Sequence, residues 1–332
     1  MKISVILPYK NAESTLGEAV LSILNQSYKN LELVVIDDHS QDTGKTMVEK
    51  WANLDSRILS LTNSGNGIVA ALNTGLAAAG GEYIARMDAD DLALPERLEK
   101  QLEKLMGQPD LGLTSCLVEH WSTPDQEKDE GFQKYIQWVN SLVSMEDIYL
   151  NRFIESPLPH PTVLFKRELI VLFGGYQDGD FPEDYELWLR WLKNGVKMEK
   201  VNEVLLKWRD GSGRLSRVDQ RYRPDAFYQI KTAYLAEHLI EIGKKQVWIW
   251  GAGRKSRQRV RLLQEYGIEI VGFIDIKPQK TTLFPCVTPD QIPESGQWFI
   301  LSYVGKWGAR EQIRVFLQQK GYREGADFLV VG

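Results

Sequence analysis

Cysteine is scarce in this sequence. Cys116 and Cys286 are the two cysteines among its 332 residues. A disulfide scaffold and a cysteine-based zinc site both need more cysteines, so both are excluded. The low count is typical of a protein that works in a reducing cytosol.

An excess of positive charge and a long apolar run are also missing. Lys and Arg number 40 against 45 Asp and Glu, which gives a net charge of −5. This balance excludes a nucleic-acid binder that depends on a global positive field. No apolar run approaches the roughly 20 residues that span a bilayer, and the first eight residues are too short for the apolar part of a signal sequence. We therefore expect a soluble, cytoplasmic protein with at most peripheral membrane association.

The remaining composition is that of a folded protein with room for two domains. Hydrophobic residues make up 43% and charged residues 26% of the chain, which is ordinary for globular proteins. Strand and helix patterns alternate over the first hundred residues, which predicts an α/β fold with a mostly parallel sheet and helices on both faces. Thr15 and Glu18 have the spacing of a capping box and predict the start of the first helix.

A second strand–helix series begins at residue 246. A strand pattern over 247–250 leads into Gly251-Ala252-Gly253, a helix pattern over 256–266 and a strand pattern that ends at Asp275. This order resembles the dinucleotide fingerprint of Rossmann folds, with Ser256 in place of the third glycine. A bound nucleotide, a vestigial site and a docking domain are all consistent with it. We predict domains at 1–223 and 244–332, joined by a helix over 224–243.

Carboxylates gather where two predicted strands end. Asp88, Asp90 and Asp91 follow the strand pattern over 83–87, and Asp37-Asp38 follows the one over 31–36. Both groups lie at the carboxyl edge of a parallel sheet, where α/β proteins bind ligands. Three carboxylates in four residues repel one another unless a cation offsets them, and carboxylate oxygens suit Mg²⁺ or Mn²⁺. The alternatives are a solvated acidic turn for 88–91 and a helix cap or turn for 37–38.

Taken together, these segments resemble family 2 glycosyltransferases of the GT-A fold. The resemblance covers roughly residues 1–220 and rests on SVILPYKN at 4–11, VIDDHS at 35–40, ALNTG at 71–75, YIARMDADD at 83–91 and LPERL at 94–98. Leu72 stands where many members have an arginine, so one phosphate or base contact of those members is missing here.

The resemblance implies roles for the residues of this edge. Pro8, Tyr9 and Asp38 would line the nucleotide base and ribose of a sugar-nucleotide donor. Asp88 and Asp90 would hold the divalent metal, Mn²⁺ or Mg²⁺, and through it the diphosphate of the donor. Asp91 would support the donor sugar or the metal shell.

A second family signature is a Glu-Asp pair before a helix, and Glu183-Asp184 fits it. By resemblance Asp184 is the general base that takes the acceptor hydroxyl proton, with Glu183 nearby; without the other motifs the pair would be a helix start. One base is sufficient for a single displacement, which inverts the anomeric centre. The Gln-x-x-Arg-Trp motif of processive members is missing downstream, so transfer of a single sugar is expected.

A basic loop follows over residues 207–223, with five arginines in its last fifteen residues. A mobile basic loop can close over a diphosphate and stabilise its charge. By resemblance Arg214 and Ser216 are the best-placed residues for this role. The alternatives are a solvated basic face and a patch for an anionic acceptor or a membrane surface. His160 stands in a Pro-His-Pro turn, where contact with metal or acceptor and a structural turn are the two interpretations.

The sequence therefore predicts an inverting, metal-dependent glycosyltransferase with a Rossmann-like C-terminal domain. The expected donor is a UDP-sugar, and the expected acceptor is a hydroxyl of a glycan, a glycolipid or a small polyol. The expected setting is bacterial surface polysaccharide or lipopolysaccharide assembly at the inner face of the membrane, and a homo-oligomer is left open. Three alternatives are a nucleotidyltransferase, a non-catalytic sugar-nucleotide-binding scaffold, and an NAD-dependent sugar-modifying enzyme that uses the C-terminal domain. The glycine-rich basic loop expected of a nucleotidyltransferase is missing at residues 8–11. The acidic residues that a non-catalytic scaffold would have lost are intact.

Overall fold

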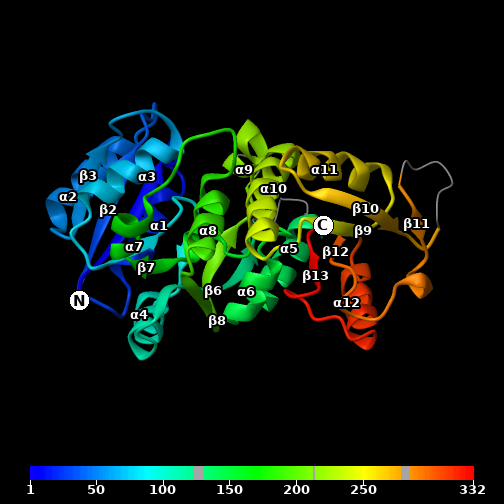
Figure 1. Ribbon diagram of the computed structural model, residues 1–332. Helices are drawn as coiled ribbons and strands as arrows, with labels where there is room; N and C mark the ends of the chain where they lie inside the picture. The colour runs from blue at the N-terminus through cyan, green and yellow to red at the C-terminus, as the bar shows by residue number, and fades with distance from the viewer. Residues whose placement is uncertain (123–129, 212–213, 278–283) are drawn as a thin grey trace. The chain divides into compact units, whose positions relative to one another are not determined.

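The computed structural model describes residues 1–122, 130–211, 214–277 and 284–332 (Figure 1). The chain divides into two compact units. The first contains residues 1–148 and 157–219, and the second contains residues 149–156 and 220–332. Each unit is built around a β-sheet of its own.

The first unit is built on an eight-stranded sheet of order β3-β2-β1-β4-β7-β6-β8-β5. Its strands are β1 (Ile3–Tyr9), β2 (Leu31–Asp37), β3 (Ile58–Thr62), β4 (Tyr83–Arg86), β5 (Leu92–Ala93), β6 (Leu111–Trp121), β7 (Leu164–Lys166) and β8 (Lys197–Arg209). Strand β1 pairs in parallel with β2 and β4, and β6 pairs in parallel with β8. Only β7 and β5 run against their neighbours. The predicted α/β class with a mostly parallel sheet is confirmed.

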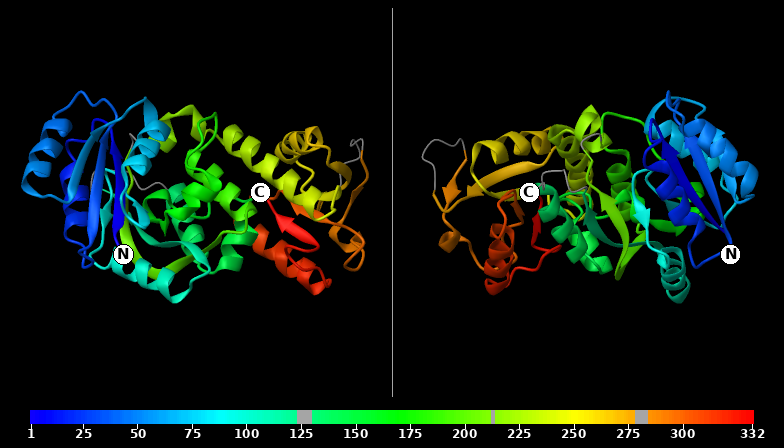
Figure 2. Two further views of the ribbon diagram at one scale, coloured as in Figure 1. Left: turned by 60° about the vertical axis from the view of Figure 1, so that its left-hand side comes forward. Right: turned by 180° about the vertical axis from the view of Figure 1, so that it is seen from behind.

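Helices cover both faces of this sheet (Figure 2). They are α1 (Leu16–Leu24), α2 (Gly44–Leu54), α3 (Gly67–Ala78), α4 (Arg97–Gly107), α5 (Glu130–Ser141), α6 (Met145–Asn151), α7 (Glu168–Phe173), α8 (Glu183–Lys193) and α9 (Leu215–Val218). Alternate residues of β1 enter different cores because strand side chains alternate. Val5 and Leu7 pack in the core that contains α1 and α4, whereas Ile6 packs in the core that contains α3 and α8.

The start of α1 differs from the prediction. Thr15 is the N-cap residue, but its side chain makes no capping hydrogen bond. Glu18 instead accepts a hydrogen bond from Arg209 Nη2 at 2.7 Å, so the predicted capping box is wrong. A contact between residues far apart in the chain has replaced a local one.

The second unit has a five-stranded, wholly parallel sheet of order β11-β10-β9-β12-β13. Its elements are α10 (Pro224–Glu241), β9 (Gln246–Trp250), α11 (Arg254–Glu265), β10 (Glu269–Ile274), β11 (Cys286–Val287), β12 (Ile300–Ser302), α12 (Ala309–Gln319) and β13 (Phe328–Val330). The chain starts in the middle of the sheet at β9, builds one side, and then returns to build the other. The strand order therefore reverses between β9 and β12, which is the point where parallel α/β sheets open a crevice.

Helix α10 belongs to the second unit. Lys231 on α10 is buried, and its Nζ donates hydrogen bonds to the carbonyls of Ile154 at 3.0 Å and Val331 at 2.9 Å. In the described part of the chain, no helix is both long and apolar enough to cross a membrane.

Candidate active site

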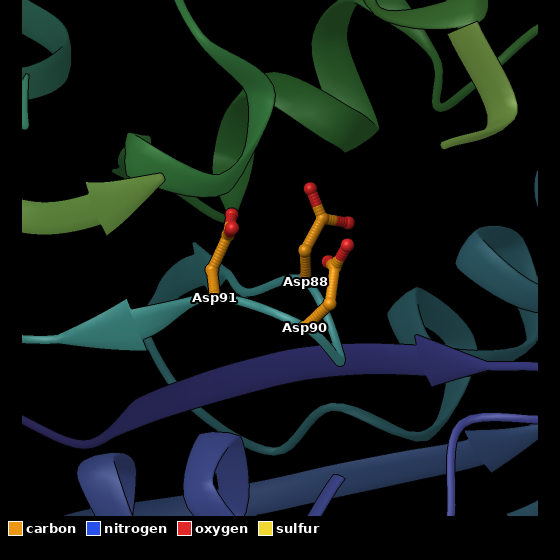
Figure 3. A group of neighbouring side chains, drawn as sticks. All are labelled: Asp88, Asp90 and Asp91. Atoms are coloured by element: carbon orange, nitrogen blue, oxygen red, sulfur yellow. The ribbon is translucent and has the colours of Figure 1, made fainter. Parts of the chain in front are cut away.

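Three carboxylates meet in the turn between β4 and β5. The ligand oxygens of Asp88, Asp90 and Asp91 all lie within 4.8 Å of one another. Figure 3 shows the three side chains on the same side of this turn, with Asp88 and Asp90 next to each other. Asp88 and Asp90 are half-buried, and Asp91 is buried. Because β4 runs parallel to β1, the turn lies at the carboxyl edge of the parallel strands, as predicted.

The carboxylate cluster is electrostatically unfavourable by itself. Burial, with a further contribution from Asp88, raises the pKa of Asp90 to about 6. Burial and the two neighbouring carboxylates raise the pKa of Asp91 well above its ordinary value. Asp91 Oδ1 accepts a hydrogen bond from the backbone of Arg209 at 2.9 Å, whereas its buried Oδ2 has no partner among the described residues. A cluster of hard oxygen donors with one unsatisfied oxygen fits a divalent cation such as Mg²⁺ or Mn²⁺.

Two buried arginines, Arg86 and Arg97, contact the segment that carries the carboxylate cluster. Arg86 Nη1 donates to Asp88 Oδ1. Arg97 Nη2 donates to the backbone carbonyl of Arg86 at 2.7 Å, and Arg97 Nε donates to Gln101 at 3.1 Å. Burial lowers the pKa of Arg97. Burial also opposes the charge on Arg86, but Asp88 and other acidic groups around it raise the pKa of Arg86 overall. The charged guanidinium of Arg86 therefore offsets part of the negative charge of the carboxylate cluster.

Arg209, the last residue of β8, forms hydrogen bonds with the same turn. Its Nε donates to the carbonyl of Asp90 at 2.6 Å, and its Nη2 donates to Glu18 at 2.7 Å. Its guanidinium carbon lies 3.8 Å from the centre of the Trp121 ring, a cation–π contact. The sequence placed Arg209 only in a basic loop, because nothing local marked β8 as a strand that ends beside residues 90 and 91.

The Glu183-Asp184 pair begins α8. Glu183 is buried and Asp184 is half-buried. Burial, followed by the charge of Glu183, raises the pKa of Asp184 to about 8. The Arg86 guanidinium lowers the pKa of both Asp90 and Asp184. Asp90 and Asp184 therefore both lie within electrostatic reach of the buried Arg86. The fold brings together two acidic residues that are almost a hundred positions apart in the sequence.

His160 lies behind Glu183. Its Nδ1 is 3.9 Å from Glu183 Oε1, and its Nε2 is 2.7 Å from the hydroxyl of Tyr176. Burial and the nearby Arg86 lower the pKa of His160 well below its ordinary value, so the ring is neutral. Asn73 in turn holds the backbone of Tyr176. Asn73 Nδ2 donates a hydrogen bond to the carbonyl of Tyr176, and Asn73 Oδ1 accepts one from the N–H of Tyr176. Sequence reasoning missed Tyr176, because no local pattern marks a tyrosine that faces a histidine sixteen residues away.

The predicted nucleotide-lining residues lie at the same edge of the sheet but not on one face. Tyr9 is part of the core on the α1 side, and its ring packs against Gly44 of α2. Pro8 is buried and, by strand alternation, faces the opposite side. Asp38 Oδ1 accepts hydrogen bonds from Asn63 Nδ2 at 2.6 Å and from Gly67 N–H at 2.9 Å. Asp38 thus holds the start of α3.

Of the two predicted loop residues, Arg214 lies within electrostatic reach of the carboxylates. Its positive charge lowers the pKa of Asp90 and Asp91. Its guanidinium carbon lies 4.5 Å and 4.6 Å from the ring centres of Phe132 and Trp208. Ser216 is exposed on α9. Gly213, also in this loop, lies outside the described residues.

Comparison with known proteins identifies the family. The model of glycosyl transferase family 2 matches residues 4–170. An uncharacterised glycosyltransferase of Haemophilus influenzae is 31% identical over 251 residues, which cover 73% of this chain and 75% of the relative. The chain belongs to glycosyltransferase family 2.

Other relatives of this glycosyltransferase have names that state a process or a product. The amylovoran biosynthesis glycosyltransferase AmsE of Erwinia amylovora is 29% identical over 217 residues, 64% of this chain and 78% of the relative. A UDP-Glc:α-D-GlcNAc-diphosphoundecaprenol β-1,3-glucosyltransferase of Escherichia coli is 30% identical over 221 residues, 64% of this chain and 79% of the relative. Among solved structures, S. aureus TarS 1–349 in complex with UDP-GlcNAc superposes with a TM-score of 0.54 at 18% identity, covering 80% of this chain and 71% of that one. That likeness shows the fold.

Proposed function

We propose that this glycosyltransferase moves one sugar residue from a UDP-sugar to a hydroxyl group of a glycan or glycolipid acceptor, with inversion at the anomeric carbon. The relative from E. coli is named for a UDP-Glc donor and a diphosphoundecaprenol-linked acceptor. TarS was solved with UDP-GlcNAc. A mannosyltransferase of Pyrobaculum calidifontis with a TM-score of 0.50 was solved with GDP-Man and Mn²⁺. These names support a nucleotide-sugar donor for this chain.

The observation that carries the proposal is the carboxylate cluster at the carboxyl edge of the sheet. Asp88 and Asp90 would hold Mn²⁺ or Mg²⁺, and the unpaired Oδ2 of Asp91 faces the same cluster. The bound ion would offset the negative charge that develops on the departing diphosphate. Arg209 fixes the backbone of Asp90, so the turn keeps its shape, and Arg214 adds positive charge beside it.

Asp184 is the proposed general base. It would accept the proton of the acceptor hydroxyl while that oxygen bonds to the anomeric carbon and the bond to the diphosphate oxygen breaks. Its pKa of about 8 matches this task, because the carboxylate then binds a proton firmly once it is transferred. His160 and Tyr176 would hold Glu183, whose charge supports that raised pKa. We place the transfer in the first unit, and the names of the relatives support a setting in polysaccharide assembly.

The test is nucleotide release and sugar transfer with UDP-sugars in the presence of Mn²⁺. Asp184→Asn should lower kcat by about a hundredfold or more with little change in the KM for the donor. Asp180→Asn is a matched control, because Asp180 is an exposed acid four residues before Asp184; it should leave both constants unchanged. Wild-type turnover in Asp184→Asn would show that another group accepts the proton.

A further inference from the structure

Asp210, the first residue after β8, is a buried acid outside the carboxylate cluster. Its side chain is 5% exposed. Its backbone N–H donates to the carbonyl of Trp121 at 2.8 Å, which continues the pairing of β8 with β6 by one residue. A carboxylate buried to this depth is costly unless charged or polar partners surround it. The partners of Asp210 therefore indicate what this carboxylate holds in place.

Two side chains from different elements hold the carboxylate of Asp210. His120, in β6, donates from Nε2 to Oδ2 at 3.2 Å. Arg217, in α9, forms an ion pair in which Nη2 lies 2.6 Å from Oδ1. Arg217 Nη1 also donates to the carbonyl of Gly211 at 3.1 Å. The ion pair therefore joins residues 210 and 217, which stand on either side of Arg214.

The backbone of Arg214 is bonded to the same short segment. Its N–H donates to the carbonyl of Gly211 at 3.3 Å, and its carbonyl accepts the N–H of Arg217 at 2.9 Å. Connecting segments that follow a strand are more mobile than the strand itself. Here the contacts of Arg217 with Asp210 and Gly211 fix the residue that bonds the Arg214 carbonyl. The main chain at Arg214 is thus held from both sides.

The aromatic rings that contact the Arg214 side chain are supported by the same histidine. Its guanidinium contacts Phe132 of α5 and Trp208 of β8, whose ring centres lie 5.0 Å apart in an edge-to-face arrangement. The His120 ring packs edge-to-face on Phe132, with ring centres 5.5 Å apart. Cation–π contacts with two rings restrict where the guanidinium can lie. His120 therefore connects the Asp210 carboxylate to the rings that hold Arg214.

Arg214 held in this way lies within electrostatic reach of Asp90 and Asp91. A cation that is in place before the substrate arrives stabilises developing negative charge more effectively than a mobile one, because little reorganisation is needed. Asp210 carries the opposite charge and would repel a diphosphate. An acid at this position therefore favours donor binding only through the cation that it holds in place.

We propose that Asp210 is a positioning residue of the transfer reaction, which fixes Arg214 to contact the diphosphate of the sugar-nucleotide donor. His120 and Arg217 connect the Asp210 carboxylate to Arg214. This inference rests on the proposed function, because it takes the donor diphosphate as the group that Arg214 contacts. Asp210 itself touches neither the donor nor the metal in this scheme.

Donor kinetics of the full chain, with a UDP-sugar and Mn²⁺, test this role through a double-mutant cycle. Asp210→Asn keeps the size of the side chain and removes the charge that pairs with Arg217. It should lower kcat/KM for the donor by about tenfold. Arg214→Ala should lower kcat/KM at least as much. The double variant should be no worse than Arg214→Ala alone, because Asp210 acts through that side chain.

Two further variants complete the test. Glu119→Gln is the matched control, because Glu119 is an exposed acid next to His120 in β6; it should leave kcat/KM unchanged. Arg217→Gln breaks the same ion pair from its more exposed partner, whose side chain is 35% exposed. It should reproduce the loss seen in Asp210→Asn, and this loss should also vanish in the Arg214→Ala background. Arg217→Gln keeps the test decisive if Asp210→Asn does not fold.

The sign of the Asp210→Asn effect separates positioning from simple electrostatics. Removing a negative charge near the donor would by itself strengthen donor binding, so a kcat/KM equal to or above that of the wild type would overturn the proposal. Additive losses in the double variant would also overturn it, since Asp210 would then act independently of Arg214; transfer by the wild type would still support the proposed function. Absence of transfer by the wild type with UDP-sugars would overturn the proposed function and this inference with it.

Discussion

Replacing Arg209 should loosen the carboxylate turn without removing any carboxylate. The side chain of Arg209 holds the carbonyl of Asp90, the carboxylate of Glu18 and the ring of Trp121. Its backbone N–H, which holds Asp91, stays in every variant. Arg209→Ala therefore removes support from Asp90 and leaves Asp91 in place.

The loss of stability expected for Arg209→Ala is the sum of three lost contacts. The hydrogen bond to the Asp90 carbonyl is charge-assisted and should contribute about 2 kcal/mol. The stacking on Trp121 should add about 0.5 to 1 kcal/mol. The pair with Glu18 should add less than about 1 kcal/mol, because the Glu18 side chain is 58% exposed. We expect Arg209→Ala to lower the free energy of unfolding by about 3 kcal/mol and to weaken Mn²⁺ binding by roughly 10- to 100-fold, as for other groups that orient metal ligands.

Urea denaturation and Mn²⁺ titration measure these two effects. Glu18→Gln is the matched control, because it removes only the exposed ion pair, and it should cost less than about 1 kcal/mol and leave Mn²⁺ affinity unchanged. Arg209→Lys should keep part of the stability and lose the fixed fork. If Arg209→Ala binds Mn²⁺ as tightly as the wild type, or if Glu18→Gln weakens Mn²⁺ binding equally, the clamp on Asp90 is not what holds the turn.

Three further predictions follow from buried titratable groups. Because Asp184 has a pKa of about 8, kcat should rise with pH up to that value, and Glu183→Gln should move this limb to lower pH by removing a like charge; an unmoved limb in the pH–rate profile would contradict the coupling. Lys231→Ala should lower the free energy of unfolding in urea by about 3 kcal/mol, because two buried carbonyls lose their donor; a cost below 1 kcal/mol would contradict this. Cys286 should react with a thiol reagent in the native protein, whereas Cys116, whose pKa burial raises to about 11, should react only after unfolding; two fast thiols would refute the burial.

The sequence was informative where strands are short and mainly apolar. β1 to β4 are short, mainly apolar strands, and they lie in the part of the chain where alternating strand and helix patterns predict an α/β fold. Strands β6 and β8 were not predicted. β8 carries charged residues along its length and buries Lys200, whose amine donates to the carbonyl of Val139. Lys200 can be buried in the sheet because its amine has a partner in α5. Local sequence patterns therefore do not predict β8 as a strand.

The candidate site shows the same division. Asp88, Asp90 and Asp184 were named from short motifs, because the chemistry needs several residues close together in the chain. Arg209 and Tyr176 were not singled out, because each acts through a partner from a distant segment. Tyr9 was named for a ligand contact, which stays a prediction, and its ring also packs in the core on the α1 side.

The most direct test of the central claim is a Mn²⁺ titration followed by electron paramagnetic resonance, with and without UDP. The signal of free Mn²⁺ should fall in the presence of the wild-type protein and UDP. The Asp90→Ala variant should leave the free signal intact, because Asp88 and Asp91 alone provide too few fixed oxygens. Equal loss of the free signal in the wild type and in Asp90→Ala would place the ion elsewhere and would contradict the assignment of this turn as the metal site.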